Sequence, residues 1–144
     1  MNVLTVEGLT KRYSGFALED VSFTLGEGRI MGLIGRNGAG KTTALKSILG
    51  MIKPQGGRIT VLGHELPGGE AACKQEMGVV LGGIDFYMQK RLSDITSATR
   101  RFYPAWDAGA YSRHMAHFGL DEHKRVNELS AGMRVKYLIA LALS

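Results

Sequence analysis

Residues 35–42 constrain the fold of this chain more than any other segment. They read GRNGAGKT and match the pattern G-x-x-x-x-G-K-[ST], directly after the apolar run at 30–34 and before a helical pattern. Glycines in such a loop let backbone N–H groups approach phosphate oxygens, because no Cβ stands in the way. A helix beginning near Lys41 adds unpaired N–H groups and the positive end of its dipole. This context predicts a nucleotide phosphate site rather than a turn that merely joins strand to helix.

Individual side chains of the loop have distinct expected roles. Lys41 carries the positive charge that such a loop brings to the β- and γ-phosphates, and we expect it to be the catalytic residue of the loop. The hydroxyl of Thr42 is placed to ligate Mg²⁺, and Thr43 is a further candidate phosphate contact. The residues expected to bind nucleotide phosphates are Gly35, Arg36, Asn37, Gly38, Ala39, Gly40, Lys41, Thr42 and Thr43.

Tyr13 is a candidate contact for the base of a nucleotide. It precedes Gly35 by 22 positions and follows Lys11 and Arg12. An aromatic ring near the mouth of a phosphate site can stack on a purine, and such stacking contributes roughly 1–3 kcal/mol. The alternative is that Tyr13 is a structural residue on a strand surface. Spacing alone does not favour either interpretation over the other.

Hydropathy patterns predict an α/β part followed by a helical part. Apolar or alternating runs predict strands at 3–8, 20–25, 30–34, 58–62 and 77–81, with 30–34 buried on both faces. Apolar residues at helical spacing predict a helix from about Lys41 to Gly50, and others at 92–102, 108–118 and 131–143. We therefore expect a strand-rich α/β part that is followed, near residue 84, by a helical part.

Composition excludes several classes of protein. The 144 residues carry 18 Lys and Arg against 13 Asp and Glu, without a basic block that would suggest a nucleic-acid arm. Cys73 is the single cysteine, which excludes an internal disulfide framework and fits a reducing compartment. The longest apolar run, at 138–143, is too short to span a bilayer, and the first residues lack the layout of a signal peptide. We expect a cytoplasmic protein without a nucleic-acid partner.

Residues 129–133, which read LSAGM, open the last predicted helix. Ser130 is a suitable N-cap for that helix. Alternatively, the cap, the following glycine and the helix dipole together form a second anion-binding site. Taken alone, the five residues favour the structural interpretation.

Together, these features resemble the ATP-binding subunit of a bacterial ABC transporter. The resemblance covers the whole chain and includes the opening segment LTKRYSGFALEDVSFTLGEGRIMGLIGRNGAGKTT. It implies an α/β fold with an ABC-type P-loop nucleotide-binding core, partial and with an antiparallel β portion, over 1–83, followed by a helical subdomain with the signature motif over 84–144. Tyr13 matches the adenine-stacking aromatic of that family, and 129–133 match the position of its signature motif, usually LSGGQ.

The resemblance also implies cofactors and partners. ATP and Mg²⁺ are the expected ligands, with ATP sandwiched in a head-to-tail dimer of identical or related subunits. Ser130, Ala131 and Gly132 would then touch the ATP held by the other subunit. A membrane-spanning permease is the expected further partner, which would place the protein peripherally on the inner face of the cell membrane.

The chain departs from the family pattern in three ways. Ala131 and Met133 replace glycine and glutamine of the signature. Gly82 stands where the family has a glutamine that reaches the metal, and Asp85 is a possible substitute. The sequence stops at Ser144, before the expected metal-binding aspartate, catalytic glutamate and switch histidine. We therefore expect an N-terminal fragment, cut after the signature motif, that binds nucleotide weakly without turning it over.

Three functions are compatible with the motifs. The first is the motor subunit of a transporter, and we expect an exporter because residues 102–107, FYPAWD, resemble a stretch of export ATPases linked to peptide-antibiotic resistance. The second is a soluble, non-transport ABC protein acting on ribosomes or DNA, which usually has paired cassettes or a charged linker. The third is a kinase or another P-loop enzyme, which would not explain 129–133.

Overall fold

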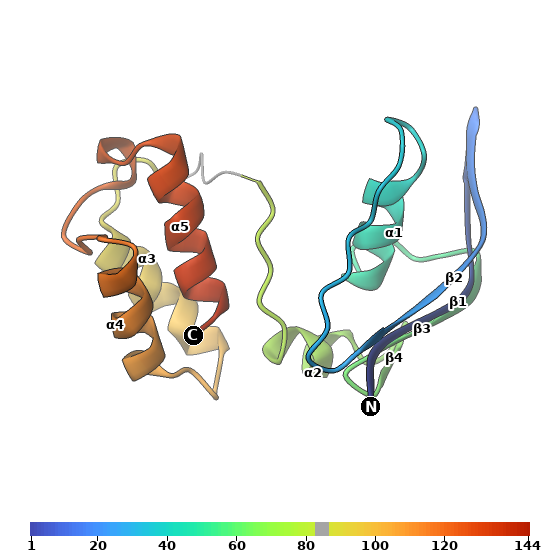
Figure 1. Ribbon diagram of the computed structural model, residues 1–144, viewed down its shortest axis with the longest axis horizontal. Coiled ribbons are helices and arrows are strands. Elements are labelled where there is room, and N and C mark those ends of the chain that lie inside the picture. Colours follow the sequence, from blue (N-terminus) through green and yellow to red (C-terminus); the bar gives the residue numbers. More distant parts are fainter. Residues whose placement is uncertain (83–86) are drawn as a thin grey trace. The chain divides into compact units, whose positions relative to one another are not determined.

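The computed structural model describes residues 1–82 and 87–144 and divides the chain into two units, Met1–Lys74 and Gln75–Ser144 (Figure 1). Each unit has buried hydrophobic residues of its own. The predicted boundary between residues 83 and 84 lies outside the described residues, so that boundary stays a prediction.

The first unit contains a four-stranded antiparallel sheet. Its strands are β1 (Asn2–Tyr13), β2 (Phe16–Gly26), β3 (Gly56–Val61) and β4 (His64–Leu66), in the order β2-β1-β3-β4 (Figure 1). A two-residue turn joins β1 to β2 and pairs Tyr13 with Phe16 at the end of the ladder. The strands expected at 3–8 and 20–25 lie within β1 and β2, and the one expected at 58–62 overlaps β3. The hydropathy pattern does not predict the short strand β4.

Two helices accompany the sheet. Helix α1 (Lys41–Ile48) buries Ala44, Ser47 and Ile48, which lie at helical spacing. It ends before Gly50, whose φ of +62° lets its N–H donate to the carbonyl oxygen of Ser47 at 3.0 Å. The short helix α2 (Glu70–Gln75), which the hydropathy pattern does not predict, buries Cys73.

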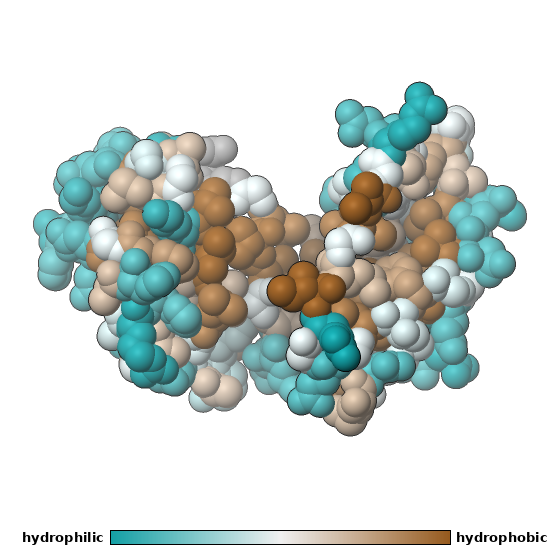
Figure 2. All heavy atoms as spheres, in the orientation of Figure 1, coloured by the Kyte–Doolittle hydropathy of each residue, from teal (hydrophilic) through white to brown (hydrophobic). Residues whose placement is uncertain are grey.

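Two predicted strands are absent, and for both the prediction was wrong. Residues 30–34 and 77–81 form no regular strand. Ile30 and Ile34 are essentially fully exposed, at 102% and 95%, and Leu81 is 61% exposed. A buried strand needs hydrogen-bonded neighbours, and no strand within the described ranges pairs with either segment. Figure 2 shows hydrophobic residues, in brown, at the surface of each unit.

The second unit is helical, as expected. It comprises α3 (Leu92–Thr99), η1 (Arg100–Phe102), α4 (Ala108–His117), η2 (Val126–Glu128) and α5 (Ala131–Ala142). Apolar residues from these elements form one core, whose buried members are Leu92, Tyr111, Met115, Val126, Leu129, Tyr137 and Ala140. Among the described residues, no helix is both long enough and apolar enough to cross a membrane.

Three hydroxyl groups meet inside this helical core. The Thr96 hydroxyl lies 3.0 Å from the Tyr111 hydroxyl and 2.9 Å from that of Tyr137. Tyr137 also donates to the carbonyl oxygen of Leu92 at 3.1 Å, in the first turn of α3. Burial raises the pKa of both tyrosines, which stay neutral and able to donate. The cluster ties α5 to α3 and α4 with its polar groups paired.

Candidate functional site

The loop at 35–40 leads directly into the first turn of α1, as the motif predicts. Gly40 is the N-cap residue of α1, and as a glycine it offers no side chain to accept hydrogen bonds from the N–H groups of the first turn. Its carbonyl oxygen accepts from the N–H of Ala44 at 2.8 Å, which begins the helical ladder. The helix therefore presents backbone donors and the positive end of its dipole beside the loop.

Gly40 cannot be replaced without moving its surroundings. Its φ is +93°, in the left-handed region that favours glycine. A Cβ at this position would lie 2.8 Å from the ring of Phe16 and 2.8 Å from a methyl group of Leu18, both of which come from β2. This close approach packs the junction of loop and helix against the sheet.

The ammonium group of Lys41 is held by the loop itself. It donates to the carbonyl oxygens of Gly35 and Arg36, at 2.5 and 2.8 Å. Both acceptors are neutral, so they leave the positive charge of Lys41 uncompensated by these two contacts. The charge is available at the loop to a ligand with phosphate oxygens.

A cavity of about 510 Å³ lies beside the loop. This volume falls within the range of about 300–1,000 Å³ found for small-molecule sites. Its lining residues come from the β1–β2 turn, the start of β2, the loop and the first turn of α1: Gly15, Phe16, Asn37, Gly38, Gly40, Lys41, Thr42 and Thr43. Six of the nine predicted phosphate contacts therefore line one cavity.

The donor set of the cavity fits a magnesium ion carried by a polyphosphate. Thr42 is exposed in the first turn of α1 and supplies one neutral hydroxyl oxygen. Mg²⁺ usually keeps several waters and takes its remaining oxygen ligands from a few protein groups and substrate phosphates. The described residues that line the cavity contain no carboxylate, so phosphate oxygens would have to provide the anionic ligands.

Tyr13 lies at the edge of this region rather than among the lining residues. It is 46% exposed, and its ring stacks on that of Phe16 with 6.3 Å between centroids and 24° between planes. The ammonium group of Lys11 lies 5.6 Å from the centroid of the Tyr13 ring. Sequence reasoning missed Phe16, although the Ser14-Gly15 pair could have indicated a two-residue turn that brings Phe16 beside Tyr13.

Ser130, Ala131 and Gly132 lie at the start of α5, in the second unit, and all three are exposed. The Ser130 hydroxyl accepts from the N–H of Met133 at 3.2 Å, which confirms that Ser130 is the N-cap. Met133 is partly buried and packs against the helical core. Its apolar side chain is thus used for packing, where the resemblance would place a polar glutamine.

Gly82 occupies the position where the resemblance would place a glutamine, and the structure describes it. Gly82 has a φ of +66°, and a Cβ added to it would have nothing within 4 Å. The backbone there is therefore strained for other residues but uncrowded. Asp85, the possible substitute for the family glutamine, lies outside the described residues.

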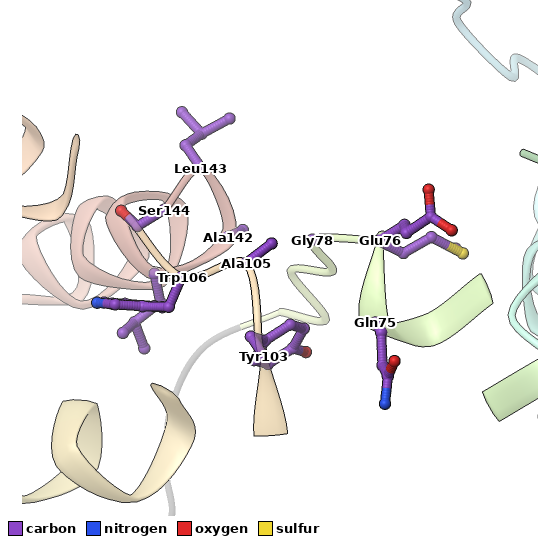
Figure 3. Close-up of a pocket in the computed structure, with 11 residues that line it drawn as sticks. Gln75, Glu76, Gly78, Tyr103, Ala105, Trp106, Ala142, Leu143 and Ser144 are labelled. Atoms are coloured by element: carbon purple, nitrogen blue, oxygen red, sulfur yellow. The ribbon is translucent and has the colours of Figure 1, made fainter. Parts of the chain in front are cut away.

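A second cavity, of about 280 Å³, lies within the helical unit (Figure 3). Tyr103 and Trp106 line it together with the C-terminal end of α5 and residues 75–78. Glu76 is the one charged side chain among the described residues that line it, so this cavity lacks the cationic groups that a phosphate requires. Its walls do not resemble those of the loop cavity.

The aromatic stretch at 102–107 has structural roles within the helical unit. The Trp106 ring packs against that of Tyr111, with 5.5 Å between centroids. Asp107 caps α4 by accepting from the N–H of Ala110 at 2.9 Å, and this hydrogen bond lowers the pKa of its carboxyl group. Packing and capping account for Trp106 and Asp107 without a ligand.

Comparison with known proteins identifies a family, several relatives and a similar solved structure. The family model described as "ABC transporter" matches residues 18–144. The chain is 33% identical to the Nod factor export ATP-binding protein I of Ralstonia nicotianae, and this match covers 98% of the chain and 46% of that protein. It is 32% identical to the phosphonates import ATP-binding protein PhnC of Wolinella succinogenes, over 99% of the chain and 58% of that protein. The chain thus spans about half the length of these curated relatives.

A solved structure described as the ATP-binding subunit of an ABC transporter superposes with a TM-score of 0.85 at 28% identity. The match covers 97% of this chain and 61% of that one. It confirms the predicted fold class, an α/β core with an antiparallel β portion followed by a helical subdomain.

Proposed function

The chain belongs to the ABC transporter family, and we propose that it binds ATP with Mg²⁺ in the cavity beside residues 35–43, as part of a transporter's ATP-binding subunit. The observation that carries this proposal is the convergence of the loop, the uncapped first turn of α1 and the Lys41 ammonium group on one cavity. Backbone N–H groups and a cation in one place suit a polyphosphate.

Different residues of the chain would contact the phosphates, the metal ion and the adenine of MgATP. The N–H groups of the loop and of the first turn of α1 would hold the phosphates, and Lys41 would exchange its carbonyl partners for phosphate oxygens. Thr42 would supply one hydroxyl to the metal. Tyr13, at the edge of the cavity, would stack on the adenine.

Hydrolysis needs a group that orients and deprotonates water, besides the phosphate contacts. The described residues that line the cavity include no aspartate, glutamate or histidine. Residues 1–144 would therefore bind ATP with little or no turnover, and the whole protein would hydrolyse it with further residues.

The exposed start of α5 supports a dimeric arrangement. Ser130, Ala131 and Gly132 are accessible, so they are free to approach the ATP of a second subunit. A membrane permease would be the other partner, with the protein on the cytoplasmic side. The relatives described above are named as transporter subunits, which does not favour a ribosome- or DNA-acting protein. Because relatives named for export and import match similarly, the exporter direction stays a prediction.

Calorimetric titration of the purified protein with MgATP tests the proposal. We expect saturable binding that Lys41→Ala weakens strongly, together with hydrolysis near background. Absence of binding would contradict the proposed site. Robust ATP hydrolysis by residues 1–144 that Lys41→Ala abolishes would contradict the proposed lack of turnover.

A further inference from the structure

The cavity beside the loop has an aromatic wall that the phosphate contacts do not explain. Phe16 opens β2 and is half-buried, and with Gly15 it lines the cavity together with the loop and helix residues. Its ring tip lies 2.8 Å from where a Cβ of Gly40 would be, which places the ring against the junction of loop and α1. Phe16 is therefore adjacent to the place where the phosphates would be held.

An aromatic ring beside a phosphate site contributes to binding of the sugar and base of a nucleotide, and not to binding of its phosphates. A bare polyphosphate is fully ionic and gains nothing from an apolar ring. A sugar or base gains from being packed against such a ring and removed from water. The two kinds of ligand should therefore respond differently to loss of the ring.

Tyr13 neighbours Phe16 but is not among the residues that line the cavity. Their rings stack at 6.3 Å, their backbones are paired across the turn, and Tyr13 is the more exposed of the two. Phe16 lines the cavity and reaches the position beside Gly40, whereas Tyr13 adjoins Phe16 and is not among the lining residues. A nucleotide anchored by its phosphates at the loop would meet Phe16 before it reaches Tyr13.

We infer that Phe16 is a specificity-determining residue, a second aromatic contact for the sugar and base of the bound nucleoside triphosphate. This inference rests on the proposed function, because it assumes that the loop holds the phosphates. It assigns to Phe16 the preference of the site for a nucleoside triphosphate over a polyphosphate without a base.

The test compares two ligands, MgATP and magnesium tripolyphosphate, by calorimetric titration of the wild type and of Phe16→Leu. Leucine keeps apolar bulk against Gly40 but removes the aromatic face. We expect Phe16→Leu to weaken MgATP binding about tenfold, in line with the loss of one stacking contact. Tripolyphosphate binding should change by less than about twofold, because the phosphate contacts remain.

The matched control is Phe102→Leu, since Phe102 is 74% exposed and lies in the other unit. It should bind both ligands like the wild type, and thermal melts should show that both variants are folded. Equal losses for both ligands in Phe16→Leu would mean that the ring only supports the loop, which would overturn the inference. Unchanged affinity for both ligands would overturn it as well.

The outcomes separate the inference from the function on which it rests. A wild-type protein that binds neither ligand would contradict the proposed function itself, and the inference with it. A wild-type protein that binds both ligands, with no selective loss of MgATP in Phe16→Leu, would leave the proposed function standing and overturn the role of Phe16 alone.

Discussion

The carbonyl oxygen of Arg36 accepts a hydrogen bond of 2.8 Å from the ammonium group of Lys41, five residues further along the chain. With the second bond, to Gly35, the lysine closes the loop on itself. The same side chain thus shapes the loop and carries the charge for a ligand. A phosphate would have to displace these neutral carbonyl acceptors. The exchange is favoured because a hydrogen bond between the ammonium group and a phosphate oxygen is charge-assisted at both ends and therefore stronger.

Lys41→Ala should weaken MgATP binding about 10- to 100-fold, because a hydrogen bond to a charged group contributes roughly 1.5–3 kcal/mol. Titration calorimetry measures the change. Lys46→Ala is the matched control, since Lys46 is an exposed lysine in the last turn of the same helix. Similar losses in both variants would indicate a general effect of charge rather than a phosphate contact of Lys41.

Gly40→Ala should be more destabilising than Gly38→Ala. Both glycines have a positive φ, +93° and +84°, so each alanine is strained by roughly 1–2 kcal/mol. At Gly40 the new methyl also meets Phe16 and Leu18, whereas at Gly38 it has nothing within 4 Å. Overpacking of this kind adds about 1–3 kcal/mol. Urea denaturation of both variants gives the difference, and equal midpoints would show that the junction relaxes freely.

The loop and α1 could be predicted from sequence because their determinants are local. Glycines, a lysine and a helical apolar pattern lie within a few residues of one another, and the structure has the helix where the pattern expects it. The N-cap role of Ser130 could be predicted for the same reason. Phe16 was missed because its place beside Gly40 depends on how β2 packs, which no short motif encodes.

The strands expected at 30–34 and 77–81 show the limit of such reasoning. A continuous apolar run indicates a segment suited to burial, but a strand also requires a partner strand distant in the sequence. No strand in the described part of the chain supplies that partner, and Ile30, Ile34 and Leu81 are left exposed.

These exposed residues predict that residues 1–144 bind hydrophobic dyes and associate at high concentration. Ile34→Glu should lower the fluorescence of bound anilinonaphthalene sulfonate and raise the solubility. Its effect on unfolding free energy should be within about 0.5 kcal/mol, because an exposed side chain contributes little to stability. Ser14→Glu, at a residue that is already exposed and polar, is the control for added charge. Unchanged dye binding in Ile34→Glu would contradict the exposure of this segment.

Tyr137→Phe should destabilise the helical unit by about 1–3 kcal/mol, because it leaves the buried partners Leu92 and Thr96 with fewer hydrogen bonds. The stability that Tyr137 gives to the wild-type protein should also depend on pH. Burial raises the pKa of Tyr137 above the value of about 10 in an unfolded chain, so the folded state binds more protons at high pH. The stability that Tyr137 contributes is therefore fully present below about pH 10 and is lost as the pH rises beyond it.

Urea denaturation between pH 8 and pH 11 separates these effects. The variant should start from a lower stability and lose less of it across the alkaline range than the wild type. Equal alkaline slopes in the two proteins would show that Tyr137 does not titrate differently on unfolding.

Gly132→Ala separates a structural role of this glycine from a functional one. Gly132 is exposed in the first turn of α5, and a Cβ there would have nothing within 4 Å. Alanine favours helix over glycine by up to about 1 kcal/mol, so the variant should be as stable as the wild type or more stable. If Gly132 approaches the ATP of a second subunit, as proposed, the added methyl should instead weaken ATP-dependent dimerisation, measured by analytical ultracentrifugation. Greater stability with unimpaired dimerisation would contradict the proposed contact. Greater stability with weaker dimerisation would support a contact between Gly132 and the ATP of a second subunit.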